Sequence, residues 1–384
     1  MSRELGLAVL REDYDEPRIA VMEHFTSLSR EVVIGLTGRD PLTEGPDAIN
    51  AIYQQVGREL EIDLNWGGGL PDRGGERFDW SDGATTKMNR QGQTCVQWGI
   101  FSTTHAEDGR HFHHIPKPAG VAEALAFDPA PYFPQSVAEL TQRFTQEYAQ
   151  MLRLCGDVCY PIPHHYTTAF HFPLAIFGFE LLCETGMADE DALSKLMERF
   201  AEISLRITTA WSRVPGIAGF ICHDDLTMTS GPIFPPAWYR RHIFPHYRQI
   251  FAPLRTAGIP IIFCSDGDCT EFIDDVVDAG ADGINIEHWV ALEPVVQRYP
   301  DMIIVGNLSS DVMAHGSPQQ IIEHTTRCMA AGAAARRFVV NVGGGLTHDI
   351  PLENLRVYLE TRKELARTMR GSTHSLSGRS PRLG

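Results

Sequence analysis

The sequence predicts an α/β fold, and within that class a (β/α)8 TIM barrel, on three observations. Short apolar segments alternate with helix-like stretches, most clearly at residues 217–222, 259–264 and 283–287. Apolar strands that alternate with helices indicate parallel strands covered on both faces. Seven such strands can be counted along the chain, and we expect an eighth in its early part, which would close a barrel. No G-x-G-x-x-G motif follows any strand, which disfavours the rival open sheet that binds dinucleotides.

The early part of the chain predicts an N-terminal extension that leads into a first strand. Residues 18–36 lie between Pro17 and Gly38, a pattern typical of the start and end of a helix. Residues 47–60 have apolar side chains at helical spacing and precede a predicted strand over residues 62–66. Three glycines follow that strand and allow a sharp turn. We therefore expect the side chains that end it to contact substrate, although a simple flexible loop is the alternative: Asn65 and Trp66.

Residues 74–118 interrupt the alternation of strands and helices. Short segments in which apolar and polar residues alternate, as in strands, are separated there by sequences typical of turns, such as Ser81-Asp82-Gly83. This pattern predicts an inserted β-hairpin region, a lid or an excursion from the barrel edge. Its histidines lack nearby cysteines or carboxylates that would complete a metal site, so we expect a solvated hairpin.

The rest of the chain follows the barrel pattern. Ser136, with Glu139 three residues later, predicts a capped helix over residues 136–154, and a strand follows over 157–162. The loop after this strand holds candidates for contact with substrate, with simple loop packing as the alternative: His164, His165 and Tyr166. Further helices are predicted over residues 172–183, 189–212, 317–331 and 351–369, and further strands over 302–306 and 338–341.

Composition limits the domain organisation and the partners. We expect residues 1–370 to form one domain and residues 371–384, which are polar, to form a disordered tail. A net charge of −16 disfavours nucleic acid as a partner. No run of 18 apolar residues exists, which argues against a membrane span. Charged residues occupy the N-terminus where a signal peptide would be apolar, so we expect a cytoplasmic protein. Eight cysteines without regular spacing do not indicate a disulfide framework.

Groups able to do chemistry follow three of the predicted strands at once. His223, Asp224 and Asp225 follow the first, Cys264 and Asp266 end the second, and Glu287 and His288 end the third. Parallel strands place their carboxyl ends on one rim, so these groups should meet there. Asp224 and Asp225 with His223 could serve as acid–base groups, although Asp also commonly caps a turn. Cys264 and Asp266 could ligate zinc, with His223, Glu287 or His288 completing the set.

Several motifs over residues 132–365 resemble the uroporphyrinogen decarboxylase superfamily. This group includes the porphyrinogen decarboxylases and the methylcobamide-dependent methyltransferases, which share a TIM barrel. The motifs that carry the resemblance are Asp224-Asp225-Leu226, Gly231-Pro232, Trp238-Tyr239, Gly306-Asn307-Leu308, Gly343-Gly344-Gly345 and Pro351-Leu352-Glu353-Asn354. Together they are specific for the superfamily, and none is specific for one reaction.

The sequence departs from both branches of the superfamily in its catalytic groups. The methyltransferase branch binds zinc with a His-x-Cys pair and a distant cysteine, whereas this chain has Cys264-Ser265-Asp266 and a glycine at the distant position. The decarboxylase branch has an early arginine-rich loop, which this chain lacks. Its histidine in the final glycine turn maps to Gly344, with His348 close by. We take Asn307 and His348 as further substrate-binding candidates.

The resemblance implies an enzyme with a small-molecule substrate. The first hypothesis is a metal-assisted methyltransferase or demethylase that uses Zn²⁺ and a corrinoid (cobalamin) partner protein; the inserted region favours this branch. The second is a decarboxylase or other lyase that uses Asp and His without a metal. A non-enzymatic binding barrel or dimer scaffold is the third. Related barrels often form homodimers, which leaves the oligomeric state open.

Overall fold

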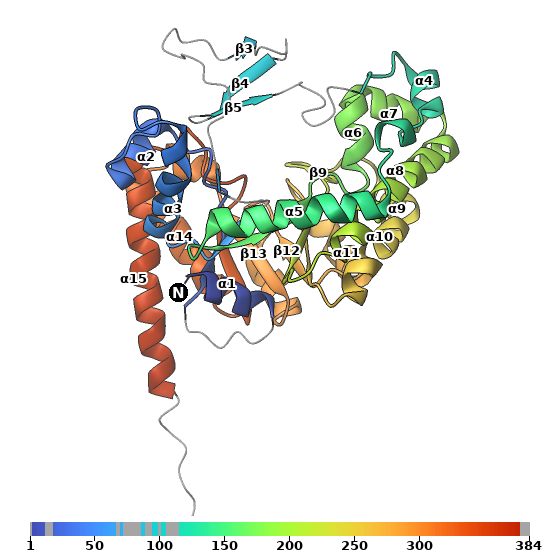
Figure 1. The fold of residues 1–384 in the computed structure, drawn as a ribbon. Helices are drawn as coiled ribbons and strands as arrows, with labels where there is room; N and C mark the ends of the chain where they lie inside the picture. Colours follow the sequence, from blue (N-terminus) through green and yellow to red (C-terminus); the bar gives the residue numbers. More distant parts are fainter. Residues whose placement is uncertain are drawn as a thin grey trace, which may run out of the picture.

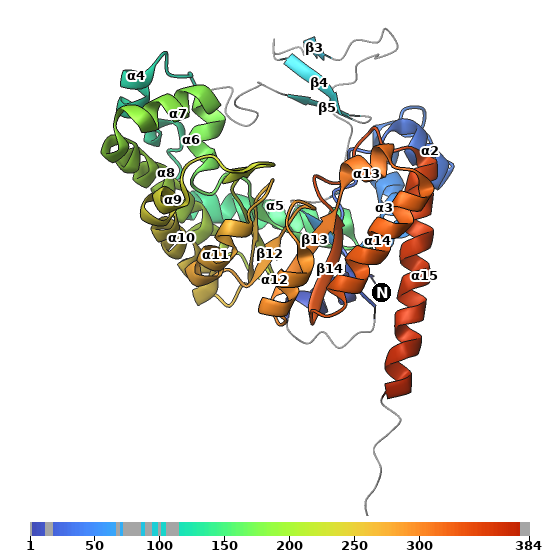
Figure 2. The same cartoon turned by 180° about the vertical axis from the view of Figure 1, so that it is seen from behind.

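The apolar segments of the sequence form strands that are buried on both faces. All four residues of β8 (Phe220–His223) and β11 (Ile261–Cys264) are buried, as are all six of β13 (Ile303–Leu308) and β14 (Arg337–Val342). The structure is a computed structural model that describes residues 2–11, 18–66, 70–71, 86–88, 94–98, 101–104 and 115–376. Within these residues the fold is α/β, as predicted, with a parallel central sheet surrounded by helices (Figures 1 and 2).

Eight strand positions in the described chain follow one another around a ring. Seven of them pair side by side from β1 through β14 to β7, and β2 pairs with β6. Only Pro163 separates β6 from β7, so these two segments form one strand position. A parallel bridge between Met22 and Leu64 joins β1 to β2 and closes the ring. The order is β1 (Ala20–Val21), β2 (Leu64–Trp66), β6 (Tyr160–Ile162) with β7 (His164–His165), β8, β11, β12 (Gly283–Asn285), β13 and β14.

Helices cover the outside of the ring and one of its ends. The first helix contacts β1, β2 and β6 at the end opposite the short hairpin of β9 and β10 (Figure 1). Longer helices lie along the strands and carry buried apolar stripes. The helices of the barrel are α1 (Ser2–Leu10), α2 (Arg30–Thr37), α3 (Ile49–Glu59), α5 (Val137–Cys155), α8 (Glu190–Trp211), α9 (Pro236–His242), α10 (Phe244–Thr256), α11 (Ile273–Ala279), α12 (Leu292–Arg298), α13 (Ser310–His315), α14 (Pro318–Gly332) and α15 (Leu352–Leu376).

Smaller elements complete the described chain. A helical lobe stands beside the start of α8 and includes α4, α6 and α7 (Figure 1). The remaining bounds are α4 (Val121–Ala126), α6 (His171–Phe177), α7 (Phe179–Ala188), β9 (Thr227–Met228), β10 (Gly231–Pro232) and the 3-10 turns η1 (Pro46–Ala48), η2 (Ala130–Tyr132) and η3 (Thr270–Phe272).

The first strand of the barrel lies where the sequence predicted a helix. The prediction of one helix over residues 18–36 is wrong, because β1 occupies Ala20–Val21 and α2 begins only after Ser29, whose hydroxyl accepts a hydrogen bond from Val32 N. The buried carboxylate of Asp63 accepts a hydrogen bond from Val21 N at 2.9 Å and pairs with Arg18. These contacts hold this two-residue strand between β14 and β2 in the ring.

Most later elements match the predictions, with two differences at helix boundaries. Ser136 and Glu139 form the predicted capping box at the start of α5. The predicted helix over residues 172–183 is divided into α6 and α7 at Gly178, which has a positive φ of 80°. The predicted closing helix over residues 351–369 is longer than expected, because α15 continues to Leu376; the rest of the predicted tail, residues 377–384, lies outside the described residues.

The inserted region contains a small antiparallel sheet, as the hairpin prediction requires. It consists of β3 (Thr86–Met88), β4 (Thr94–Trp98) and β5 (Phe101–Thr104). Figure 1 places it on the side of the barrel where the β9–β10 hairpin lies. The predicted turn at Ser81-Asp82-Gly83 and the histidines of this region, at positions 105, 111, 113 and 114, lie outside the described residues.

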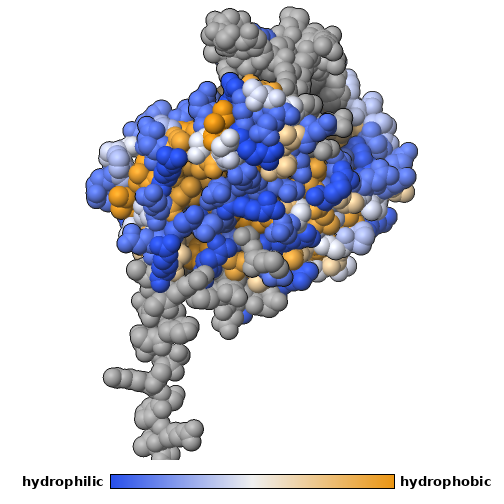
Figure 3. All heavy atoms as spheres, turned by 60° about the vertical axis from the view of Figure 1, so that its left-hand side comes forward, coloured by the Kyte–Doolittle hydropathy of each residue, from blue (hydrophilic) through white to orange (hydrophobic). Residues whose placement is uncertain are grey.

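The surface of the protein is mixed in character. The face shown in Figure 3 is largely hydrophilic, with separate apolar patches between polar side chains. In the described part of the chain, no helix combines the length and the hydropathy that a membrane crossing requires.

A buried polar group ties the last helix to the first strand. Glu23, directly after β1, accepts hydrogen bonds from Val342 N at 3.1 Å and from the Tyr358 hydroxyl at 2.8 Å. Arg362 donates to the same hydroxyl at 3.3 Å and also to the carbonyl of Leu60. Burial raises the pKa of Glu23 to about 7, against the opposing effects of Val342 N–H, Tyr358 and Arg362.

We expect Tyr358→Phe to lower the free energy of unfolding by about 1–3 kcal/mol, because the change removes one hydrogen bond from each of the buried groups Glu23 and Arg362. Urea unfolding at pH 7.5 measures this difference. Tyr132→Phe is the matched control, since the Tyr132 hydroxyl makes no hydrogen bond with a described residue; it should change stability by less than about 0.5 kcal/mol. Equal effects of the two variants would contradict the proposed role of Tyr358.

Candidate functional site

The register of two neighbouring strands brings an imidazole and a thiol together. In the parallel pairing of β8 and β11, His223 lies opposite Cys264, and both are the last residues of their strands. Paired residues in a sheet point to the same face, so the two side chains are neighbours. Both residues are buried, at 1% and 5% exposure. The reactive imidazole and thiol therefore lie next to each other at the carboxyl ends of β8 and β11.

His223, Cys264 and Asp266 form one candidate metal site. Their possible ligand atoms all lie within 4.8 Å of one another, and His223 Nε2 is 3.8 Å from Asp266 Oδ1. The Asp266 side chain is 55% exposed, so the group opens to solvent on that side. The structure thus brings together three of the predicted metal ligands.

The backbone fixes which nitrogen of His223 faces this group. His223 Nδ1 lies 2.8 Å from the carbonyl oxygen of Tyr166, which can only accept a hydrogen bond. Nδ1 therefore carries a proton, and Nε2 points toward Cys264 and the carboxylates. A histidine that ligates a metal commonly donates its other ring N–H to a backbone carbonyl in this way.

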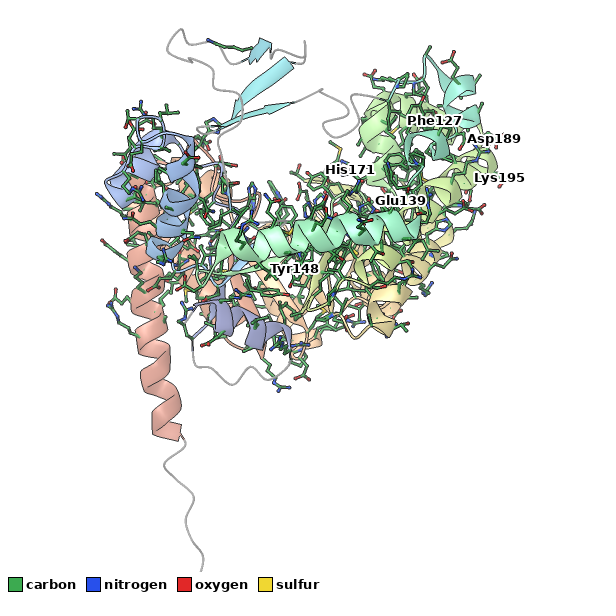
Figure 4. All side chains as sticks on the ribbon, viewed as in Figure 1. Phe127, Glu139, Tyr148, His171, Asp189 and Lys195 are labelled. Atoms are coloured by element: carbon green, nitrogen blue, oxygen red, sulfur yellow. The ribbon has the colours of Figure 1, made fainter. Side chains whose placement is uncertain are left out.

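His171 and Asp225 form a second group with the same nitrogen of His223. Asp225 Oδ1 is 3.1 Å from His223 Nε2, and Asp225 Oδ2 is 2.7 Å from His171 Nδ1. His171 lies at the start of α6, at the upper end of the barrel in Figure 4. His171, which is 52 residues before His223, was not predicted as a site residue. The only signal in the sequence was the pair of adjacent carboxylates, Asp224 and Asp225, which indicates that Asp225 needs a cationic partner.

Charge pairing dominates the protonation of this second group. Burial alone would raise the pKa of Asp225, but His223 and His171 outweigh burial and hold that pKa well below its ordinary value. Burial alone would lower the pKa of His223, but Asp225 and Cys264 raise it well above the usual range. Burial raises the pKa of the Cys264 thiol to about 11, against the opposing effect of His223. Pairing with Asp225 thus favours the imidazolium form of His223, and burial favours the thiol form of Cys264.

Asp224 has a structural role, which differs from the role of Asp225 at the rim. Its carboxylate is fully buried and accepts four hydrogen bonds, from the backbone N–H groups of Ala169, Phe170 and His171 and from the Tyr247 hydroxyl. Burial raises the pKa of Asp224, while these donors lower it. Asp224, expected from the sequence as a catalytic group, therefore positions the loop that presents His171.

A third carboxylate completes the rim. Glu287 Oε2 accepts a hydrogen bond from Gly267 N at 2.8 Å, which holds the turn after Asp266. Burial and then Asp266 raise the pKa of Glu287. Asp266 N in turn donates to Asp225 Oδ1 at 3.1 Å. Several carboxylates thus surround one imidazole, an arrangement that a bound cation would stabilise.

Two predicted substrate-binding residues lie beside His223, and a third lies next to them. The Tyr166 ring stacks on the imidazole with centroids 4.3 Å apart, and the Trp66 ring lies 5.7 Å from it. His164 lies 5.9 Å from Trp66. Trp66 Nε1 is buried and makes no hydrogen bond with a described residue. These rings form an aromatic wall next to the candidate metal site.

Other predicted site residues lie elsewhere. His165 points away from the wall and bonds Ser204 of α8 at 2.8 Å, because neighbouring strand residues face opposite sides. Asn307 is 9% exposed and donates to the Val290 carbonyl, a structural contact. His348 is exposed in the last loop, and Asn65 is buried in the middle of β2.

The prediction that His288 joins the metal ligands needs correction. His288 belongs to neither of the two groups and instead lines a separate cavity with residues of α12 and α14. The chain turns after β12, so that Glu287 faces the rim and the next residue faces outward.

The structural role of His165 predicts a pH dependence. Burial, and then His164, lower its pKa to about 3 in the folded protein. Below about pH 6.5 the His165 imidazole binds a proton in the unfolded chain but stays neutral in the folded protein. The free energy of unfolding therefore falls as the pH falls. This one residue should remove about 2 kcal/mol from the free energy of unfolding between pH 7 and pH 5.

We expect His165→Gln to lose less stability than the parent protein over that pH range in urea unfolding. His315→Gln, at a residue that is 67% exposed, is the control and should follow the parent. A His165→Gln variant with the same pH slope as the parent would show that His165 is not held neutral.

Comparisons with known proteins agree with the architecture of the site. Residues 168–365, about half of the chain, match the family model described as uroporphyrinogen decarboxylase (URO-D). A uroporphyrinogen decarboxylase from Thermus thermophilus is 28% identical over 182 residues, which cover 47% of this chain and 51% of that protein. A methylated-thiol–coenzyme M methyltransferase from Methanosarcina mazei is 27% identical over 130 residues, 33% of each chain. The matches to curated relatives thus span only a third to a half of those proteins.

The likeness to a solved structure extends over nearly the whole chain. A methyltransferase from Methanosarcina mazei superposes with a TM-score of 0.59, covering 95% of this chain and 98% of that one, at 14% identity. At that identity the likeness concerns the fold.

Proposed function

This chain belongs to the uroporphyrinogen decarboxylase family, and we propose that it is a metal-assisted methyltransferase or demethylase within it. The single observation that carries the proposal is the convergence of His223 Nε2, Cys264 Sγ and the Asp266 carboxylate. The small-molecule substrate would be a methylated thiol or ether, and a corrinoid protein would be the methyl carrier. The relative named for methylated thiols supports this choice between the branches of the family.

The donor set fits Zn²⁺. Zinc binds imidazole, thiolate and carboxylate, and three protein ligands leave the fourth position for water or substrate, as in catalytic zinc sites. His223 already presents Nε2, and Tyr166 fixes the ring through Nδ1. Cys264 is in contact with His223 and would bind as the thiolate. A bound Zn²⁺ would supply Lewis-acid polarisation of a thiol or ether group.

The surrounding residues orient the ligands and the substrate. The Glu287 carboxylate holds the turn at Gly267 and thereby the position of Asp266. His171 pairs with Asp225, so this carboxylate can stay ionised when His223 is neutral. Trp66, Tyr166 and His164 offer apolar ring surface for a methyl group beside the metal ligands, with the Trp66 N–H free to donate.

The second candidate function is a metal-free decarboxylase or other lyase. The observation that favours it is the His171–Asp225–His223 chain, in which Asp225 holds His223 as an imidazolium that can donate a proton. In that case His223 would be the general acid and Asp225 would stabilise its charged form.

Metal content tests the first proposal directly. We expect about one zinc per chain, measured by elemental analysis of protein purified without chelators, and at least a tenfold weaker affinity in Cys264→Ser because the thiolate ligand is lost. Cys183→Ser, at a thiol of α7 outside the site, is the matched control and should keep its zinc. Absence of zinc from the parent even after reconstitution, or full occupancy in Cys264→Ser, would refute the metal site.

Metal removal separates the two reactions. Transfer of a methyl group from a methylated thiol to free cob(I)alamin should stop in chelator-treated protein and return with added Zn²⁺. His171→Gln should lower this rate only modestly, because His171 is not one of the three proposed metal ligands and its ion pair is with Asp225. Decarboxylation or lyase activity that survives metal removal and is lost in His171→Gln would instead establish the second candidate.

A further inference from the structure

A cavity separate from the proposed active site lies between α12 and α14, at the carboxyl ends of β12 and β13. The two helices pack next to each other on the outside of the barrel (Figure 2). The cavity has a volume of about 210 Å³ and is lined by residues that include His288, Glu293, Asn307, His324, Arg327 and Cys328. The proposed function uses none of these side chains.

The protonation of His324 is fixed by the backbone. Ser309 N donates a hydrogen bond to His324 Nε2 at 2.8 Å. A backbone N–H can only donate, so Nε2 is the unprotonated nitrogen. The proton of the neutral ring is therefore on Nδ1. Burial, and then Arg327 and His288, lower the pKa of His324 to about 4, in agreement with a neutral ring.

This assignment leaves two donors facing each other. Arg327 Nη2 lies 3.3 Å from His324 Nδ1, and a guanidinium has no acceptor. The two N–H groups therefore cannot bond each other, and one acceptor placed between them would satisfy both. Arg327 makes no ion pair with a carboxylate in the described part of the chain. Asn307 cannot turn its amide to them, since Nδ2 is held by the Val290 carbonyl.

We propose that this cavity binds a small oxyanion, a carboxylate or phosphate group, between His324 Nδ1–H and the guanidinium of Arg327. One anionic oxygen can accept hydrogen bonds from both the His324 Nδ1–H and an Arg327 N–H. The second oxygen can accept a hydrogen bond from another N–H of the guanidinium. Arg327 is exposed, so water can occupy this position, but an oxyanion would also pair with the guanidinium charge. Glu293 stands at the cavity edge and is the carboxylate that limits affinity.

Calorimetric titration of the full-length protein with inorganic phosphate, and separately with acetate, at constant ionic strength tests the site. Two variants remove one donor each. Arg327→Met removes the guanidinium, and His324→Gln keeps an acceptor for Ser309 N while deleting the Nδ1 donor. Each should weaken binding by about tenfold or more, since charge-assisted hydrogen bonds are lost. Glu293→Gln should strengthen it.

Two controls separate this site from the rest of the protein. Arg213→Met removes an exposed guanidinium elsewhere and should leave the affinity unchanged. Cys264→Ser should also leave it unchanged, which separates this cavity from the metal site. Failure of both phosphate and acetate to bind the parent protein would overturn the proposal. Binding that Arg327→Met and His324→Gln do not weaken, or that Arg213→Met weakens equally, would overturn it as well.

Discussion

The parallel pairing of β8 with β11 in one register is the constraint on which the site depends. That register places His223 beside Cys264 at the ends of two buried strands, and a shift of either strand by one residue would turn its side chain to the other face, away from its neighbour. Buried apolar residues before them, from Phe220 and Ile261 onward, fix the register because their side chains fill the barrel and its helix interface. The packing of the core therefore determines the chemistry of the rim.

The neighbouring carboxylates of Asp224 and Asp225 have different roles in the site. Asp224 is turned inward, where backbone N–H groups of residues 169–171 and Tyr247 satisfy it, so the loop after β7 cannot move away. Asp225 is turned to the rim, where His223 and His171 neutralise it. The loop held by Asp224 carries His171 to Asp225 and Tyr166 to His223. A structural carboxylate thus builds the electrostatic environment of a functional one.

The sequence predicts well those site residues whose positions follow from the local pattern of apolar and polar residues. It predicts poorly those that are positioned by contacts with residues distant in the sequence. Apolar runs followed at once by polar residues located His223, Cys264 and Asp266 and the barrel rim. The alternation of a strand distinguishes His164 from His165, and that rule was available before the structure. By contrast, β1 is a two-residue strand without periodicity, held by Asp63 from the next strand, and His171 acquires its role only through a loop folded back on Asp225. His288 lies in a turn after β12, where alternation no longer predicts direction.

X-ray absorption at the zinc edge of the protein as purified tests the central claim most directly. The account predicts a first shell with one sulfur at about 2.3 Å and nitrogen or oxygen neighbours at about 2.0–2.2 Å, the pattern of one cysteine, one histidine and one carboxylate with an exchangeable fourth ligand. A first shell without sulfur, or one with several sulfurs, would contradict it, because His223, Cys264 and Asp266 would then not hold the metal together.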